Sequence, residues 1–394
     1  MTNPSDAASI WIPGDDCYAF IKGRVGLYAI LRAAGIGDGD EVLIPGFTCF
    51  VVAAAVTYSG ARAVYYDIDP ATYNGDPRRA AERLSPSTRA VIVQHTFGMP
   101  MEMGDLVARC RKREILVIED CAHAMGAETA AGRVGALGDA AFASLQWSKP
   151  VTTGLGGLAR VNTEDLSKQM ARVYHREFTE PSWLKSITLA TLASLHNRFF
   201  RPRDYWRIRG AYHRLSRLGM LQGSSSDSEF TDPRMPEGYR QRFGGPRLGQ
   251  LRRVLAGLQQ TIEHRRRIAS IYLAWCGERN LLTQRVTPGS DPTYLRFPLL
   301  VEGREELLTA AREQRLELGD WLNAPLHPRE ADACAFGYAP NTCPVAEGVA
   351  ERIVNLPTHH HVDEREASRI LHFLEAHEAR IIRAPRGVTA PSSM

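Results

Sequence analysis

The chain has 394 residues, which at about 150 residues per domain favours two domains. Hydrophobic residues make up 44% and charged residues 23%, as in ordinary globular proteins, so a large buried core is expected. The 48 basic residues exceed the 44 acidic ones by only four. A charge so close to balance gives no indication of a nucleic-acid-binding surface.

The seven cysteines form no C-x-x-C pair and are odd in number. This pattern favours neither a disulfide framework nor a zinc site, and a reducing cytoplasm fits it best. The start of the chain lacks a basic segment followed by an apolar run, and the longest apolar stretch, Cys49 to Tyr58, is too short to cross a bilayer. We expect a cytoplasmic protein with no transmembrane segment.

Residues 24 to 160 alternate between strand-like and helix-like segments, the pattern of a mostly parallel sheet flanked by helices. Continuous apolar runs such as AVIV and ILVI indicate strands that are buried on both faces. We expect strands at Glu41 to Ile44, Ala63 to Asp67, Ala90 to His95, Ile115 to Glu119, Ala140 to Leu145 and Leu158 to Val161. Helices are expected at Val25 to Ala34, Phe50 to Tyr58 and Met103 to Arg113.

Beyond Ala171 the sequence changes character. Leucine and isoleucine recur at helical spacing from Leu251 and predict one long helix reaching about Trp275. A strand at Tyr294 to Val301 and helices at Arg304 to Gln314 and Asp363 to Ala379 then predict a smaller α+β unit. We therefore expect a large domain over residues 1–247 with an insertion at about 171–235, a small C-terminal domain over 248–383, and a disordered tail at 384–394.

The strongest chemical signal is the segment ILVIEDCAHA, an apolar strand that ends in Asp120. Lys149 follows in the segment SLQWSKPVTTGLGG, on a glycine-rich turn after a later strand. Ligands bind beyond the carboxyl ends of parallel strands, so both residues could face one site. Taken singly, Asp120 could equally cap a helix and Lys149 could lie on the surface.

Pyridoxal 5′-phosphate needs such a pair, a lysine amine for the Schiff base and a carboxylate that keeps the ring nitrogen protonated. Its phosphate needs backbone amides and hydroxyls. Gly23 and Arg24 open an expected helix, where the dipole favours an anion, and Ser144 precedes Lys149 by five residues.

At these residues the sequence resembles the DegT/StrS family of aminotransferases, fold type I enzymes that use pyridoxal phosphate to aminate keto-sugars attached to nucleotides. The resemblance covers most of the chain. It is carried by GIGDGDEVLIPGFTCFVVAAAV, GARAVYYDID, VIEDCAHAMGA, GALGDAAFASLQWSKPVTTGLGG, Tyr239 to Leu251, and CPVAEGVAERIVNLPTHH.

The resemblance implies a homodimer with shared active sites and a role for each matching residue. Lys149 becomes the Schiff-base lysine and proton shuttle, and Asp120 the partner of the pyridinium nitrogen. Ser144, Gly23 and Arg24 become phosphate contacts. His123 stands where the family often has glutamine, near the cofactor ring hydroxyl, and could also be a core histidine.

Three features depart from the family pattern. Cys49 stands where an aromatic ring usually stacks on the cofactor, so the thiol packs there or Phe47 or Phe50 substitutes. Arg240 replaces an asparagine that reaches the partner subunit's cofactor phosphate; it suits that phosphate or a substrate anion. The sequence between the lysine segment and Tyr239 is longer than in the family.

That longer segment concentrates positive charge, with ten basic and three acidic residues between 171 and 220. Interleaved aromatic residues make it suitable for a nucleotide, or for peripheral contact with an anionic membrane carrying a lipid-linked sugar, as well as for simple packing. We expect it to border the active site and bind substrate anions, with Arg201, Arg203 and Arg207 as the residues to test.

No metal site is expected. His359, His360 and His361 are consecutive and cannot all turn to one ion, and the calcium-like segment GDGDEV at residues 37–42 has apolar residues at the later ligand positions.

The predicted function is transfer of an amino group from glutamate or glutamine to a keto-sugar in glycan or natural-product biosynthesis. Elimination, replacement or amination of another substrate by the same cofactor remains an alternative, as does a regulator that binds the cofactor without catalysis. Some family members carry histidine in place of the lysine and dehydrate their substrates, so Lys149 favours amino transfer.

Overall fold

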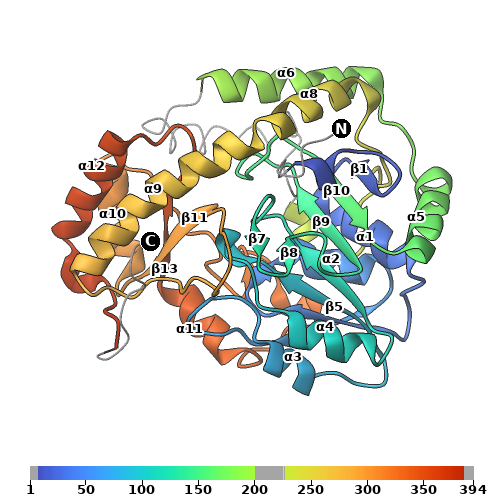
Figure 1. The fold of residues 1–394 in the computed structure, drawn as a ribbon, viewed down its shortest axis with the longest axis horizontal. Helices are drawn as coiled ribbons and strands as arrows, with labels where there is room; N and C mark the ends of the chain where they lie inside the picture. The colour runs from blue at the N-terminus through green and yellow to red at the C-terminus, as the bar shows by residue number, and fades with distance from the viewer. Residues whose placement is uncertain (1–7, 200–224, 226, 386–394) are drawn as a thin grey trace.

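A seven-stranded sheet forms the centre of the computed structural model, which describes residues 8–199, 225 and 227–385 (Figure 1). In spatial order its strands are β1 (Cys17–Phe20), β10 (Gly157–Val161), β9 (Ala140–Ser144), β6 (Leu116–Asp120), β5 (Thr88–Gln94), β2 (Glu41–Pro45) and β4 (Arg62–Tyr66). From β9 to β4 all neighbours run parallel, whereas β10 is antiparallel to both β9 and β1. The predicted α/β architecture with a mostly parallel sheet is confirmed.

Helices cover both faces of this sheet because its central strands are apolar on both sides. Val42 and Ile44 of β2 pack into the core formed with α1 (Gly23–Ala33), α2 (Phe50–Tyr58) and α5 (Glu164–Glu177). Leu43, between them, packs on the opposite face with α4 (Gly104–Arg111) and α3 (Pro77–Glu82). This alternation follows the two-residue period of a strand.

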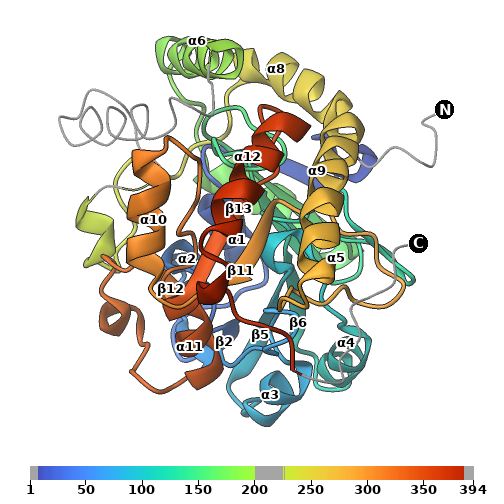
Figure 2. The same ribbon diagram turned by 90° about the vertical axis from the view of Figure 1, so that its left-hand side faces the viewer.

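A second hydrophobic core lies in the C-terminal part of the chain, whose helices and strands are the orange and red elements of Figure 2. Its two-stranded antiparallel sheet pairs β11 (Arg296–Leu300) with β13 (Ile353–Pro357). Around it pack α9 (Leu258–Glu278), α10 (Arg304–Glu313) and α12 (Glu364–Glu375). The expected α+β unit is present, and the division of the chain at residue 247 stays a prediction.

The expectation of one helix starting at Leu251 is wrong. Two helices, α8 (Gly245–Ala256) and α9, meet at Gly257. Leu251, Leu255, Leu258 and Ile262 do form a continuous stripe, but it packs against the large sheet. The small core begins only at Ile268.

Further elements connect these parts. The helices α6 (Trp183–Phe199) and α8 pack together, and α11 (Pro344–Arg352) precedes β13. The short strand β3 (Thr48–Cys49) pairs in parallel with β12 (Leu326–His327), and β7 (Glu128–Thr129) pairs with β8 (Gly132–Arg133). The β3–β12 pair brings a C-terminal segment onto the loop that follows β2.

Two sequence-based expectations fall outside the described residues. These are the disordered tail, of which only residues 384 and 385 are described, and the roles of Arg201, Arg203 and Arg207. Within the part of the chain that is described, no helix is both long and apolar enough to cross a membrane.

Buried polar bonds fix the end of β6. Glu119 is fully buried, and its carboxylate accepts hydrogen bonds from the backbone N–H groups of Gly135, Leu137 and Gly138, each at 2.8 Å. It also lies 3.1 Å from Nε2 of His95. Glu119 therefore holds the loop after β8 against the strand that carries Asp120.

We predict that Glu119→Ala lowers the free energy of unfolding by about 3 kcal/mol or more, because several buried donors lose their acceptor together. Urea denaturation measures this change. The matched control is Glu128→Ala, which removes an exposed ion pair with Arg133 and should cost less than about 1 kcal/mol. Equal losses of stability in the two variants would show that the hydrogen bonds of Glu119 do not stabilise the fold.

Candidate active site

Lys149 and Asp120 come together beyond the carboxyl end of the parallel strands. Asp120 ends β6, and Lys149 lies on the turn that follows β9, the next strand in the sheet. Both side chains are buried, with 3% of Asp120 and 8% of Lys149 exposed. Ligands of parallel sheets bind beyond the carboxyl ends of the strands, so both side chains lie where a ligand is expected.

Burial moves the pKa values of the two groups toward each other. Loss of hydration lowers the pKa of Lys149 to about 8, although Asp120 and Cys49 oppose that shift. Loss of hydration raises the pKa of Asp120 to about 6, against the N–H of Ala122 and the charge of Lys149. Near neutral pH a fraction of Lys149 is thus an uncharged amine, the form needed for a nucleophile or base.

Each group keeps an atom available for a ligand. Oδ1 of Asp120 accepts the N–H of Ala122 at 2.9 Å. Among the residues that the structure describes, Oδ2 accepts no hydrogen bond and Nζ of Lys149 donates none. Nζ instead lies 4.0 Å from the centroid of the Trp321 ring.

Trp321 and His123 close one side of the site. The His123 ring lies 4.5 Å from the Trp321 ring and accepts the N–H of Phe97 at Nδ1. Burial, together with the positive charges of Lys149 and Arg296, holds the pKa of His123 well below its usual range. A neutral ring with Nδ1 already accepting carries its proton on Nε2, which makes Nε2 a donor toward the site.

Gly23, Ser144 and Gly157 form a tight cradle at the start of α1. A Cβ placed on Gly23 would lie 3.1 Å from Cβ of Ser144, and one placed on Gly157 would overlap the backbone of Gly23. Helix α1 has no side-chain cap and no acidic residue in its first turn. The dipole at the start of α1 favours an anion, so this end of the helix is suited to a phosphate.

Charged side chains surround this cradle in a way that the sequence did not indicate. Arg24 forms a buried ion pair with Glu229, and Nη2 of Arg24 donates to Oγ of Ser225 at 2.6 Å. Lys22 donates to the hydroxyl of Tyr239, which in turn donates to Glu229 at 2.7 Å. The side chain of Arg24 therefore serves this network, and only its backbone remains suited to a phosphate.

The structure separates the three candidates for stacking on the cofactor ring. Phe50 packs its ring 5.2 Å from Phe230 and 5.6 Å from Phe336, inside the hydrophobic core that covers one face of the large sheet. Phe47 is fully buried beside Phe97. Cys49 is half-buried, and its thiol lies close enough to Lys149 and Asp120 for their charges to act on its pKa, which burial raises. Of these three, Cys49 is the residue that faces the site.

Arg240 lies apart from these groups in the single chain. Its side chain is exposed, and its guanidinium carbon stands 5.9 Å from the ring of Tyr28 on α1. Contact with a partner subunit's phosphate stays a prediction.

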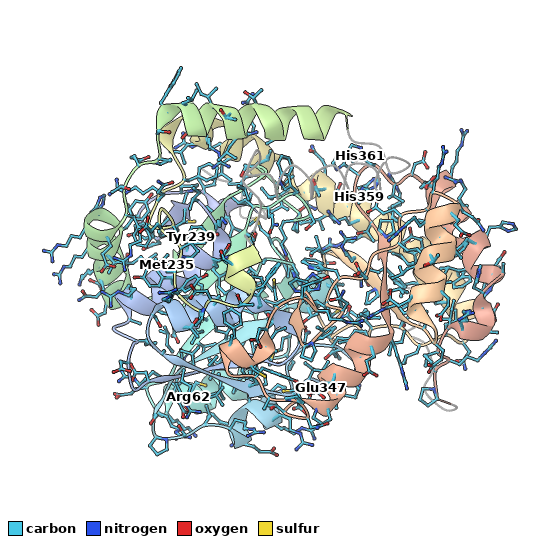
Figure 3. The ribbon with its side chains drawn as sticks, turned by 180° about the vertical axis from the view of Figure 1, so that it is seen from behind. Arg62, Met235, Tyr239, Glu347, His359 and His361 are labelled. Carbon is cyan, nitrogen blue, oxygen red and sulfur yellow. The ribbon has the colours of Figure 1, made fainter. Side chains whose placement is uncertain are left out.

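Of the three consecutive histidines, His359 has a carboxylate partner. Nε2 of His359 lies 2.9 Å from Oε2 of Glu317, and His359 and His361 lie beside the C-terminal elements in Figure 3. Among the described residues one group has metal-ligand spacing, and it consists of His95, Glu119 and Cys121. The Glu119 oxygens already accept hydrogen bonds from three backbone N–H groups. We therefore interpret His95, Glu119 and Cys121 as residues that stabilise the fold.

Comparison with known proteins agrees with this geometry. A relative from Caulobacter vibrioides, GDP-perosamine synthase, is 28% identical over 90% of this chain and 83% of its own length. The UDP-N-acetyl-3-dehydro-alpha-D-glucosamine 3-aminotransferase of Acidithiobacillus ferrooxidans is 27% identical over 89% of this chain and 80% of its own length. A Streptococcus pneumoniae structure in a PLP form aligns with a TM-score of 0.72 and 17% identity, over 96% of this chain and 92% of the other.

The fold is thus that of the pyridoxal-phosphate aminotransferases. The model of the DegT/DnrJ/EryC1/StrS aminotransferase family matches residues 13–185 and 242–375, and the chain belongs to that family. The unmatched stretch between them contains most of the basic and aromatic insertion.

We predict that Gly157→Ala weakens binding of a phosphate-bearing ligand at the cradle by about tenfold or more, because the new methyl group must displace the backbone at Gly23. Fluorescence titration with pyridoxal phosphate gives the dissociation constant, and circular dichroism reports whether the fold persists. Gly249→Ala on α8, where a Cβ meets nothing within 4 Å, is the control and should bind like the wild type. Unchanged affinity in Gly157→Ala would remove the cradle from the phosphate site.

Proposed function

We propose that the protein is a pyridoxal-phosphate-dependent aminotransferase that moves an amino group from glutamate or glutamine onto a keto-sugar joined to a nucleotide. The observation that carries this proposal is the buried pair of Lys149 and Asp120 beside the Gly23–Ser144 cradle. The names of the two relatives support the sugar acceptor, since one makes GDP-perosamine and the other aminates a UDP-linked sugar.

The residues present fit pyridoxal phosphate. When bound, this cofactor supplies a conjugated ring that accepts the electron pair released at a substrate carbon. Asp120 would hold the proton on the ring nitrogen through Oδ2, the oxygen that Ala122 leaves available. The α1 amides at Gly23 and Arg24 and the hydroxyl of Ser144 would bind the phosphate.

Lys149 would do the proton transfer. With its pKa lowered to about 8 by burial, its amine could move a proton between the substrate carbon and the cofactor in each half-reaction. His123 would donate from Nε2 to the ring hydroxyl, and Cys49 would pack against the ring face. The Trp321 ring lies 4.0 Å from Nζ of Lys149 and adds to the apolar surroundings of the amine.

We also propose that the protein forms a homodimer in the cytoplasm. Arg240 is the exposed residue through which one subunit would reach the cofactor phosphate of the other. Intact Lys149 and Asp120 favour catalysis over a purely regulatory role. Consumption of glutamate with formation of 2-oxoglutarate separates amino transfer from elimination or replacement.

We predict that Lys149→Ala lowers turnover by at least about 10³-fold, because the group that moves the proton is lost. Formation of 2-oxoglutarate from glutamate, with pyridoxal phosphate in excess, measures the effect. The control is Lys168→Ala, an exposed lysine paired with Glu164, which should leave turnover unchanged. Turnover near that of the wild type in Lys149→Ala would disprove the assignment.

A second prediction concerns pH. The Lys149 amine should react with a small acylating reagent faster as pH rises through about 8, because it is neutral above its pKa. Asp120→Asn removes the carboxylate that raises this pKa, so the midpoint should move to lower pH while turnover falls about 100-fold. Mass spectrometry of the Lys149 peptide over a pH series measures the midpoint. A midpoint near 10 in the wild type, or no shift in the variant, would count against the buried pair.

A further inference from the structure

Arg296 has too few partners for a guanidinium in its position. It begins β11, and 12% of its side chain is exposed. Within the described part of the chain its buried Nε has no hydrogen-bond partner, and its one ion pair, with Glu317, is 4.0 Å long. Buried polar groups normally have partners, so this arrangement points to an acceptor that comes from outside the chain.

Asn355 on β13 also has a buried side-chain atom without a hydrogen-bond partner among the described residues. Its side chain is fully buried, and its Oδ1 accepts the N–H of Trp321 at 2.9 Å. Its Nδ2 finds no acceptor among the described residues. Both residues border Gly319, because a Cβ placed there would lie 3.5 Å from Nη1 of Arg296 and from Cβ of Asn355.

The surrounding charges do not balance. Arg265 is also buried, and its Nη1 donates to the carbonyl of Leu295 and the hydroxyl of Thr358. The carboxylate facing these two arginines is Glu317, which is already 2.9 Å from His359. Two buried guanidinium groups thus share one engaged carboxylate, and an added anion would relieve their repulsion.

This positive region adjoins the catalytic lysine. The Trp321 ring lies 4.0 Å from Nζ of Lys149 and 5.6 Å from Cζ of Arg296. The two cations are therefore separated by no more than the sum of these distances. An amino acid has its amino group and carboxylate within such a span, and a guanidinium binds a carboxylate through two parallel hydrogen bonds.

We propose that Arg296, assisted by Asn355, binds a carboxylate of the amino donor. The inference rests on the proposed function and deepens it, because it assigns the donor half-reaction a recognition group of its own. The amino group would point to Lys149 and the carboxylate to Arg296, with the Trp321 ring beside both.

Calorimetric titration with glutarate, a five-carbon dicarboxylate without an amino group, tests the site apart from catalysis. The protein is used as purified. Wild type should bind glutarate, Arg296→Met should bind it at least tenfold more weakly, and Arg296→Lys should recover part of the affinity. The control is Arg285→Met, which removes an exposed arginine paired with Asp69 and should bind like wild type. Equal affinity in Arg296→Met and wild type would overturn the proposal, even if amino transfer itself is established.

Steady-state kinetics give a second readout. In Arg296→Met the KM for glutamate should rise at least tenfold while the KM for the keto-sugar stays unchanged. A parallel rise for alanine identifies the α-carboxylate as the bound group, whereas a rise for glutamate alone identifies the side-chain carboxylate. An equal rise in the KM values of the donor and the keto-sugar, or an unchanged KM for glutamate, would show that Arg296 does not recognise the donor.

Discussion

Shared burial of one amine and one carboxylate is the constraint on which the site depends. Lys149 loses hydration and becomes easier to deprotonate, while Asp120 loses hydration and becomes easier to protonate. Their mutual attraction limits both shifts, so each group still titrates within about two units of neutrality. The low exposure of the two residues, 3% for Asp120 and 8% for Lys149, is therefore what sets their protonation.

The site is assembled from segments that are distant in sequence. Gly157 touches the backbone at Gly23, and Glu229 joins the start of α1 through Arg24. The β3–β12 pair places Cys49 beside the segment that carries Trp321. Arg296 and Asn355 then add positive charge and unmatched donors from the small core. These contacts join the large sheet to the C-terminal part of the chain, so the site takes residues from both.

Much of the large sheet could be predicted from local patterns. The runs AVIV and ILVI gave β5 and β6 within one or two residues, because a strand buried on both faces is apolar throughout. Strand β1 was not foreseen, since four residues at the sheet edge owe their state to pairing with β10, far along the chain. The helix boundary at Gly257 was also missed, because the apolar stripe continues across it.

Some residues of the site could also be predicted from the sequence, and others could not. Asp120 and Lys149 could be found because a strand end and a glycine-rich turn are visible in sequence, and the family resemblance added Ser144 and Gly23. Trp321 gave no signal, because its place over Lys149 depends on tertiary packing alone. Arg296 and Glu119 left weak traces, as charged residues in otherwise apolar strands, and these could have been recognised as buried groups in need of partners.

Reduction with borohydride after addition of pyridoxal phosphate identifies the lysine that binds the cofactor, because it fixes the cofactor to that residue. Peptide mapping should then find the label on Lys149 and on none of Lys22, Lys112, Lys168 or Lys185. A label on another lysine, or a protein that takes up no cofactor, would show that the buried Lys149 and Asp120 do not form the cofactor site.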